Sequence, residues 1–309
     1  MHKSEAMIRI KSPLTKNDNT TLVKKISKDE IIKKYKSYNI DVARYFKEIT
    51  NIEIYKCNDT GYLFYYPLTI SGDSKFYEHF QNFDWYYMPW KWEHEITNKY
   101  LKDGLNLLEV GCAHGAFLKK INEKYNLNET VGLELNESSP INNTNWKIVN
   151  QCIQDYQKEN SNKYDVVCSY QVLEHIADVY GFIEAKIACL KSGGKLIVSV
   201  PNNESFIKDS DACLNMPPHH MGLWNTKSLK SLENIFKIKL IKFHYEELQD
   251  YHIESYISAK YYMNYKKIIG KIIRKYHKLN GKYERIKKEV IENKHAILGH
   301  TILAVYEKI

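Results

Sequence analysis

Residues 105–115, LNLLEVGCAHG, decide the fold of this chain. Apolar residues dominate the stretch up to Val110, which predicts a strand buried on both faces of a sheet. Gly111 and Gly115 allow a tight turn, and the segment that starts at Ala116, AFLKKINEKY, predicts a helix whose first N–H groups face that turn. A strand, a glycine turn and a helix in this order form the first unit of an α/β sheet.

The chain beyond this unit continues to alternate between strands and helices. Apolar runs predict six further strands, at 129–135, 146–153, 164–170, 195–201, 236–248 and 300–308, and a helix is expected at about 178–191. This alternation is typical of parallel β-α-β units with helices on both faces. We therefore expect an α/β fold with its ligand crevice beyond the carboxyl ends of the strands.

Two segments lie outside this alternation. Residues 1–95 are expected to form an N-terminal extension, and residues 96–309 the main domain. The extension should contain a mobile arm over 1–28, an amphipathic helix from Asp29, a small β-hairpin and an aromatic cap. A helical insertion rich in Lys and Tyr, at about 252–296, interrupts the main domain before its last strand.

The charge of the 309-residue chain is unevenly placed. Residues 251–309 contain 13 Lys or Arg against 5 Asp or Glu, which accounts for the whole net charge of +8, because the other 250 residues balance at 32 against 32. No apolar run is long enough to cross a membrane, and the N-terminus lacks the apolar stretch of a secretory signal. The six cysteines form no C-x-x-C pair. These features predict a cytoplasmic protein.

A carboxylate precedes the glycine turn. The segment from Glu109 to Gly115 reads E-x-G-x-A-x-G, whereas a dinucleotide-binding turn reads G-x-G-x-x-G. An acid at position 109 would repel a pyrophosphate and suits a ligand that carries an ammonium and a sulfonium. Glu134 ends the next strand, 19 residues after Gly115. A carboxylate at that place can accept hydrogen bonds from both ribose hydroxyls of an adenosine ligand.

The turn resembles motif I of the class I S-adenosylmethionine (SAM)-dependent methyltransferases, with Ala113 in place of the usual middle glycine. YDVVCSYQVLEHIAD (164–178) and GGKLIVSVPN (193–202) resemble later segments of the same family. The resemblance implies SAM as cofactor and a Rossmann-like, doubly wound sheet of seven mostly parallel strands, the last one antiparallel. It also implies the residues that contact SAM: Glu109, Gly111, Cys112, Ala113, Gly115, Phe117, Glu134, Leu135, Ile153, Gln154, Ser169, Tyr170 and Gln171.

Methyl transfer mainly requires proximity and alignment, because the sulfonium is already a good leaving group. An oxygen acceptor must also lose a proton to a nearby base. We predict His175 as that base and Glu174 as the residue that orients it; alternatively, Glu174 caps the next helix and His175 only packs. His219 and His220 follow the fifth strand, where related enzymes have a loop that faces the acceptor, and either could be a second base or bind substrate.

Two further sets of residues have alternative interpretations. Glu174, His175 and one of the later histidines could hold a divalent metal, but Gln171 stands where a carboxylate ligand would help, so no metal is expected. An aromatic stretch before the first strand contains Tyr86, Tyr87 and Trp90. These rings could bind the substrate or the sulfonium, or they could form an apolar seam between the extension and the main domain.

The resemblance favours a small-molecule acceptor. Within the family, the sequence resembles enzymes that methylate hydroxyls of sugars or sugar nucleotides for cell-surface polysaccharide, or of ubiquinone precursors. The alternatives are an N-methyltransferase of an amino sugar or another small amine, an RNA methyltransferase, a NAD-dependent oxidoreductase and a catalytically silent scaffold. Ser169-Tyr170-Gln171 replaces the N/D-P-P-Y motif of amino-directed nucleic-acid enzymes, so no specific nucleic-acid partner is expected.

The basic insertion at 252–296 remains open to two interpretations. A cationic amphipathic helix could contact RNA or an anionic membrane surface. The interpretation that we favour from the sequence is a solvated helix that covers the sheet. The sequence does not indicate an oligomeric state.

Overall fold

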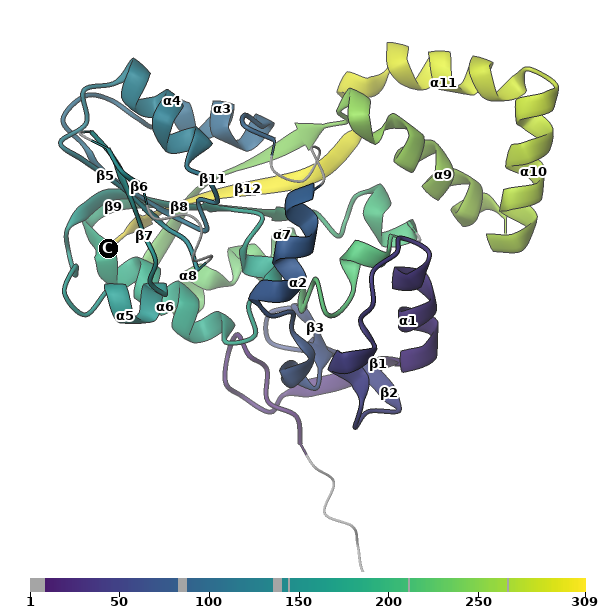
Figure 1. Cartoon of the computed structure of the whole chain (residues 1–309), viewed down its shortest axis with the longest axis horizontal. Coiled ribbons are helices and arrows are strands. Elements are labelled where there is room, and N and C mark those ends of the chain that lie inside the picture. The colour runs from purple at the N-terminus through teal and green to yellow at the C-terminus, as the bar shows by residue number, and fades with distance from the viewer. Residues whose placement is uncertain (1–8, 83–87, 136–140, 144, 211, 266) are drawn as a thin grey trace, which may run out of the picture.

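The apolar runs of the main domain form one large sheet (Figure 1). The computed structural model describes residues 9–82, 88–135, 141–143, 145–210, 212–265 and 267–309. Within these residues the sheet has the strand order β11-β12-β9-β8-β4-β5-β7-β6. The strands are β4 (Asn106–Val110), β5 (Glu129–Leu133), β6 (Ile141–Asn142), β7 (Lys147–Val149), β8 (Tyr164–Tyr170), β9 (Leu190–Pro201), β11 (Ile238–Glu247) and β12 (Leu298–Lys308).

The directions of the strands confirm the fold class. Neighbours among β9, β8, β4, β5 and β7 pair in parallel, while β12 pairs antiparallel with both β9 and β11. The seven predicted strands are therefore all present, and the last is antiparallel to the others. The additional strand, β6, is a two-residue edge that pairs antiparallel with β7.

Side chains that alternate along each strand supply two separate cores. Leu107 packs with Leu118 of α4 (Ala116–Lys124), whereas its neighbour Leu108 packs on the opposite face with Ile183 of α6 (Val179–Cys189). Helices α3 (Trp92–Asn98) and α4 lie on one face, and α5 (Ile153–Tyr156), α6 and α8 (Leu232–Ile235) lie on the other (Figure 1). Helix α7 (Thr226–Lys230) precedes α8.

The N-terminal extension forms a second, smaller sheet of order β1-β2-β3-β10. Its elements are β1 (Thr20–Ser27), α1 (Lys28–Lys36), β2 (Asn51–Cys57), β3 (Leu63–Tyr66) and α2 (Ser74–Glu78), and β10 (Gly222–Leu223) comes from the main domain. The predicted hairpin is present, but the arm expected over 1–28 is not all mobile, because 20–27 form β1. Most β1 side chains are exposed, so this edge strand lacks the apolar period that would reveal it. Since β10 joins this sheet, the division at residue 95 stays a prediction.

The insertion is helical, as predicted, but it does not cover the sheet. Three helices project from one end of the molecule and form a helical arm, which is distinct from the N-terminal arm (Figure 1). They are α9 (Ile253–Asn264), α10 (Lys267–Leu279) and α11 (Lys282–Glu292). Their apolar residues pack in a small core, which includes Tyr256, Ile257, Tyr261 and Tyr283 and is joined by Phe206 and Leu248 of the main body. In the part of the chain that the structure describes, no helix has the length and apolarity needed to span a membrane.

Candidate active site

A cavity of about 790 Å³ lies at the carboxyl ends of β4, β5 and β8, where the crevice was expected. Most residues predicted for the site line this cavity: Glu109, Gly111, Cys112, Ala113, Phe117, Glu134, Leu135, Ile153, Gln154, Tyr170, Gln171, Glu174, His175, His219 and His220. Residues at the ends of β4, β5, β7 and β8 therefore line the same cavity as residues of the loop after β9. The volume is that of a small-molecule site.

Three predicted residues lie outside the lining. Ser169 is fully buried, and its hydroxyl accepts a hydrogen bond from the Lys186 ammonium on the other face of the sheet, because neighbours on a strand point in opposite directions. A Cβ on Gly115 would come within 2.8 Å of the Trp146 ring, so packing explains that glycine. Trp90 packs against Phe117, with ring centroids 6.0 Å apart, which fits the apolar seam. Tyr86 and Tyr87 lie outside the described residues.

The turn after β4 uses unusual backbone conformations. Gly111 has a φ of 78°, and a Cβ there would lie 2.6 Å from Val172, so only glycine fits. Ala113 has a φ of 47°, in the left-handed region that L-residues avoid. The methyl group of Ala113 is therefore accommodated at a cost in backbone strain. Gln171, at the end of β8, shares this region with a φ of 54°.

Two carboxylates face the turn. Glu109 is 4% exposed, and its Oε2 has no hydrogen-bond partner among the described residues. Burial, with the nearby negative charge of Glu134, raises the pKa of Glu109 to about 8, and Lys91 partly opposes this. Glu134 accepts hydrogen bonds from the N–H groups of Ala113 and Leu135, both at 2.9 Å. A buried hydrogen-bond acceptor without a partner costs folding free energy, and a cationic ligand that donates a hydrogen bond to Glu109 would remove that cost.

The His175 ring is held in one tautomer. Its Nδ1 lies 2.6 Å from the backbone oxygen of His219, and because a carbonyl can only accept, Nδ1 carries the proton. The Nε2 atom is then an acceptor. Burial lowers the pKa of His175 to about 4, against the opposing effect of the His219 and Gln171 carbonyls, so the ring is neutral at pH 7.

Among the described residues no hydrogen bond joins Glu174 to His175, which differs from the predicted orienting contact. The two residues are adjacent on a short 3₁₀ turn, Leu173–His175, where neighbouring side chains point in different directions. Glu174 is buried, its Oε2 has no partner among the described residues, and burial raises its pKa to about 8. The carbonyl of His219 orients the ring, and no local feature of the sequence indicates this contact.

The N-terminal extension holds the histidine loop, residues 214–220 with His219 and His220, at the cavity. Tyr35 donates a hydrogen bond to the Met216 carbonyl at 2.8 Å, and Tyr65 donates one to the Asn215 carbonyl at 2.9 Å. Gly72 N–H bonds the carbonyl of Pro218 at 2.8 Å. These contacts from the N-terminal part of the chain fix the backbone that orients His175.

His175, His219 and His220 form a cluster in which one ligand nitrogen of each ring lies within 4.8 Å of the other two. Their rings are 4.5–5.0 Å apart between centroids. Burial lowers the pKa of all three, which leaves neutral imidazoles. Such a group can bind an acceptor hydroxyl or ligate a divalent metal. Glu174, a metal ligand in the alternative weighed from the sequence, is not part of the cluster.

Several cavity residues were not predicted. Lys91, Glu93 and His94 come from the start of α3, and His252 and His300 come from the two junctions of the helical arm. The charged run KWEHE at 91–95 was visible in the sequence, but nothing indicated that it faces the cavity. Positions 252 and 300 carry no local signal, since only the fold brings the ends of the insertion to this site.

Comparisons with known proteins agree with this geometry. The family model described as a methyltransferase domain matches residues 85–262. Ubiquinone biosynthesis O-methyltransferase, mitochondrial, of Dictyostelium discoideum is 28% identical over 119 residues, which cover 32% of this chain and 36% of that protein. Malonyl-[acyl-carrier protein] O-methyltransferase 2 of Ilyobacter polytropus is 25% identical over 156 residues, which cover 48% and 60%. The chain thus aligns with 36% and 60% of the length of these relatives.

Solved structures also superpose on the chain. A methyltransferase in complex with the Haloferax volcanii Trm112 methyltransferase activator superposes with a TM-score of 0.50 at 13% identity, over 70% of this chain and 89% of that chain. A SAM-dependent methyltransferase from Archaeoglobus fulgidus gives a TM-score of 0.47 at 16% identity, over 76% and 100%. Because the matched methyltransferase domain spans more than half of the chain, and Glu109 and Glu134 lie at the ends of β4 and β5 beside the glycine turn, the chain belongs to the SAM-dependent methyltransferase family.

Proposed function

We propose that this chain transfers the methyl group of SAM to an oxygen atom of a small acceptor. The observation that carries the proposal is the fixed, neutral His175 in the same cavity as Glu109 and Glu134. One wall of the cavity offers carboxylates to a cationic nucleoside, and the other offers a base. Both curated relatives are named as O-methyltransferases, which supports oxygen as the acceptor atom.

The residues present fit SAM. The unpartnered Oε2 of Glu109 would receive the ammonium of the methionine moiety, and Glu134, at the end of β5, would hold the ribose hydroxyls. Leu135, which is 59% exposed, and Ile153 would enclose the adenine. Bound there, SAM supplies an electrophilic methyl group on a good leaving group.

The chain itself must align the acceptor and take its proton. The Nε2 atom of His175 is the unprotonated nitrogen in the tautomer that the His219 carbonyl imposes, so it can take the hydroxyl proton as the oxygen–methyl bond forms. The low pKa of about 4 keeps the ring unprotonated before the acceptor arrives. His219 and His220, beside it, would hold the acceptor hydroxyl in line with the methyl group.

We extend the proposal to a polyhydroxylated acceptor, a sugar or sugar nucleotide used for cell-surface polysaccharide. Beyond the SAM subsites the cavity wall includes several groups that form hydrogen bonds: Asp73, Ser74, Tyr77, Tyr251, His252, His300 and Thr301. A sugar ring presents hydroxyls in several directions, and such a wall can satisfy them.

An amine acceptor is the second candidate, and a specific observation favours it. Glu93 Oε1 and Glu174 Oε2 both line the cavity, are buried and have no hydrogen-bond partner among the described residues. An ammonium group of an amino sugar would donate hydrogen bonds to such carboxylates and pass one proton to them, which frees the nitrogen lone pair that attacks the methyl group. A screen of sugars, amino sugars and their nucleotides, read as S-adenosylhomocysteine formation and followed by the site of methylation, distinguishes the two acceptors.

Replacing the base tests the O-methyl mechanism. We expect His175→Ala to lower kcat by about 100-fold or more, because a general base contributes about 10²–10⁴. SAM affinity should stay within about twofold, since His175 faces the acceptor and not the nucleoside. His295→Gln, which changes an exposed histidine outside the cavity, is the matched control. Full turnover by the His175 variant with SAM bound would remove His175 as the base.

A further inference from the structure

Helix α10 carries an apolar stripe that is exposed in the described part of the chain. Ile268, Ile272, Tyr276 and Leu279 are between 62% and 80% exposed, and they recur at the three- and four-residue spacing that places them on one side of a helix. Ile269 borders the stripe and is 49% exposed. Isolated exposed apolar residues need no explanation, but a continuous stripe of this kind marks an interaction site.

The orientation of α10 is fixed by its opposite side. Gly270 is buried against α9, and a Cβ there would lie 2.7 Å from the Tyr261 carbonyl. Arg274 donates hydrogen bonds to Ser258 at 3.0 Å and Glu254 at 3.3 Å, and Tyr261 bonds His277 at 2.7 Å. The helix therefore presents its stripe outward in a defined way, and the stripe is not the packing face of the arm.

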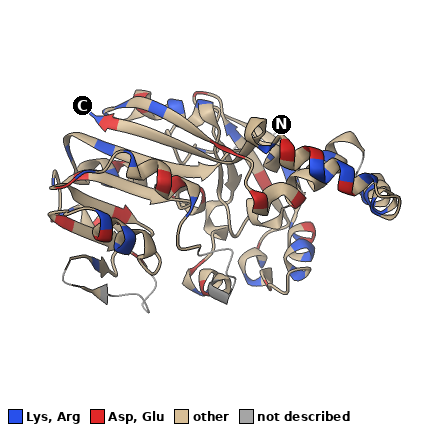
Figure 2. Cartoon of the chain, turned by 90° about the horizontal axis from the view of Figure 1, so that it is seen from above, with Lys and Arg blue, Asp and Glu red and all other residues tan. Residues whose placement is uncertain are grey.

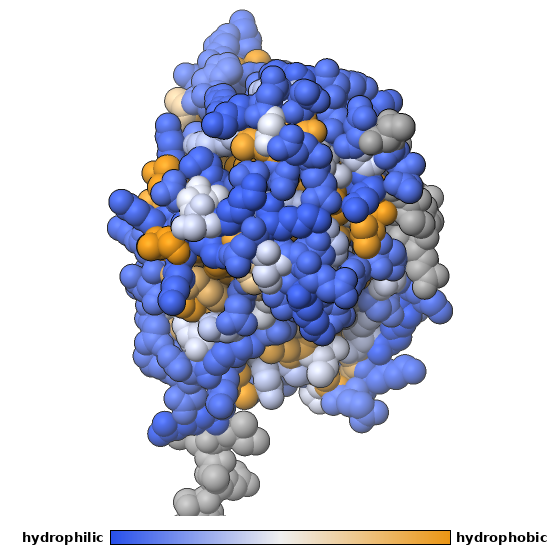
Figure 3. Space-filling view, turned by 90° about the vertical axis from the view of Figure 1, so that its left-hand side faces the viewer, coloured by the Kyte–Doolittle hydropathy of each residue, from blue (hydrophilic) through white to orange (hydrophobic). Residues whose placement is uncertain are grey.

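Basic residues flank the stripe. The sequence of α10, KIIGKIIRKYHKL, contains five Lys or Arg and no acid. Lys271 and Lys275 are exposed, lie beside the stripe on the helical wheel and form no ion pair with any residue that the structure describes. Figure 2 shows basic residues along the projecting helices. The opposite end of the molecule is mainly hydrophilic, with apolar residues scattered over it (Figure 3).

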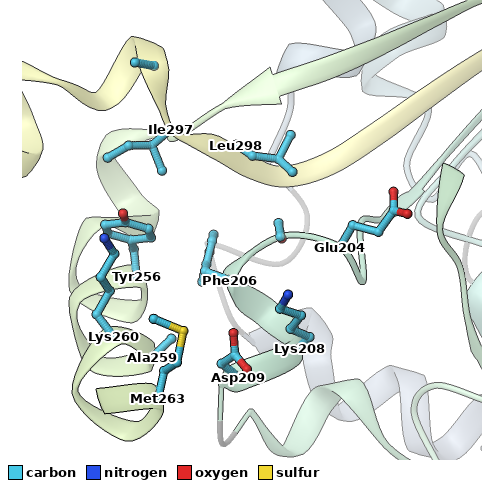
Figure 4. Close-up of a pocket in the computed structure, with 12 residues that line it drawn as sticks. Glu204, Phe206, Lys208, Asp209, Tyr256, Ala259, Lys260, Met263, Ile297 and Leu298 are labelled. Carbon is cyan, nitrogen blue, oxygen red and sulfur yellow. The ribbon is translucent and has the colours of Figure 1, made fainter.

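The arm is joined to the cavity at both of its ends. Tyr251 and His252 precede α9, His300 and Thr301 follow α11, and all four line the cavity. A smaller hollow of about 340 Å³ separates α9 from the turn Phe206–Asp209 of the main body, with Met263 on the α9 side (Figure 4). Helix α9 has 12 residues and extends for roughly 18 Å, so α10 is held about that far from the cavity.

We propose that α10 docks the protein on the surface of an anionic lipid bilayer. A bilayer surface offers negative headgroups above acyl chains, and α10 offers lysines beside isoleucines, so the two match in both respects. RNA provides the charge but no apolar layer. A second copy docked through the same helix would place cationic side chains against each other. Docking through α10 would hold the cavity about one α9 length, roughly 18 Å, from the docked helix, which makes acceptors attached to lipids candidate substrates.

Vesicle binding tests the proposal independently of methyl transfer. The full chain is sedimented with vesicles of phosphatidylcholine alone and of phosphatidylcholine with phosphatidylserine. We expect binding only to the vesicles that contain phosphatidylserine. Ile268→Ser/Ile272→Ser and Lys271→Gln/Lys275→Gln should each weaken that binding roughly tenfold or more. Each variant should still bind SAM as the parent does, which shows that it is folded and separates this test from that of the proposed function.

Matched controls change the same residue types elsewhere. Val23→Ser removes an exposed apolar residue, and Lys33→Gln/Lys36→Gln removes two exposed lysines, both in the N-terminal extension. These controls should bind vesicles like the parent. Absence of vesicle binding, equal binding to neutral vesicles, or binding that neither α10 variant weakens would overturn the proposal. So would RNA binding that persists after the isoleucine change while vesicles are not bound, or a dimer in sedimentation velocity that this change abolishes.

Discussion

Glu109 is the residue on which recognition of SAM depends in the proposed function. It is almost fully buried at the end of β4, and burial together with Glu134 raises its pKa to about 8 in the unliganded protein. A neutral carboxyl group therefore predominates at pH 7. An ammonium placed against Oε2 would stabilise the ionised form, so binding of SAM is coupled to release of a proton from Glu109.

This coupling predicts how SAM affinity depends on pH. The Kd for SAM should fall as pH rises from about 6 to about 8, by up to tenfold per pH unit, and then level off, because above the pKa the carboxylate is already ionised. Glu109→Gln should bind more weakly and flatten this dependence. Calorimetric titrations at several pH values measure it. An equally steep dependence in the variant would assign the proton to another group.

Ala113 can be tested against its backbone conformation. At a φ of 47° alanine is strained by roughly 1 kcal/mol, and glycine would relieve this while making the unfolded chain more flexible by a similar amount. We therefore expect Ala113→Gly to change the free energy of unfolding by less than about 0.5 kcal/mol. Ala185→Gly, in the buried part of α6, should destabilise by about 1 kcal/mol or more. Equal destabilisation in denaturant titrations would contradict strain at Ala113.

Some residues of the site can be predicted from the sequence, and others cannot. Glu109, Gly111 and Glu134 were predicted because they are close in sequence to strand ends, and parallel strand ends meet at one edge. The partner of His175 could not be predicted, since it is a backbone carbonyl of His219, 44 residues away. Ser169 was assigned to the cavity by its neighbours, but the pleat of β8 turns it to the opposite face.

At the scale of elements, α6 and β8 are joined by an unusual buried contact. Lys186 of α6 is 1% exposed, and its ammonium donates a hydrogen bond to the hydroxyl of Ser169. No carboxylate is bonded to it in the described part of the chain. Burial lowers the pKa of Lys186 to about 7, which means that the folded protein binds this proton much less tightly than the unfolded chain does.

Replacing this lysine should stabilise the protein. Between about pH 7 and pH 10 the unfolded chain holds the proton and the folded one does not, so the parent's stability should rise with pH. Lys186→Met should remove that rise and add about 2 kcal/mol at pH 7, after allowance for the lost Ser169 hydrogen bond. Lys36→Met, at an exposed position of α1, should have little effect. Destabilisation of the Lys186 variant in urea at pH 7 would show that the ammonium is better satisfied than its contacts indicate.

The elements differ in how clearly the sequence indicates them. The parallel strands were predicted because both of their faces are buried, which makes each a nearly continuous apolar run. β1 was missed because most of it is exposed. The helices of the insertion were predicted, but their place was not, because an apolar stripe indicates the same amphipathic helix whether it covers a sheet or faces outward.

At the scale of the whole molecule, the N-terminal extension and the main domain meet at the histidine loop. Tyrosines of the extension bond the backbone at 215 and 216, and the same loop orients His175. The cavity is therefore assembled from parts that are far apart in sequence: the first strand of the main sheet, the loop after β9 and both ends of the arm.

The central claim is that this cavity binds SAM through a carboxylate at the end of β4 and another at the end of β5. Isothermal titration calorimetry of SAM into the purified chain tests it most directly. The account predicts saturable binding at one site, weakened about tenfold or more in Glu134→Ala as well as in Glu109→Gln, since each change removes charged hydrogen-bond acceptors. A well-folded parent that gives no binding heat, or variants that bind SAM as tightly as the parent, would contradict it.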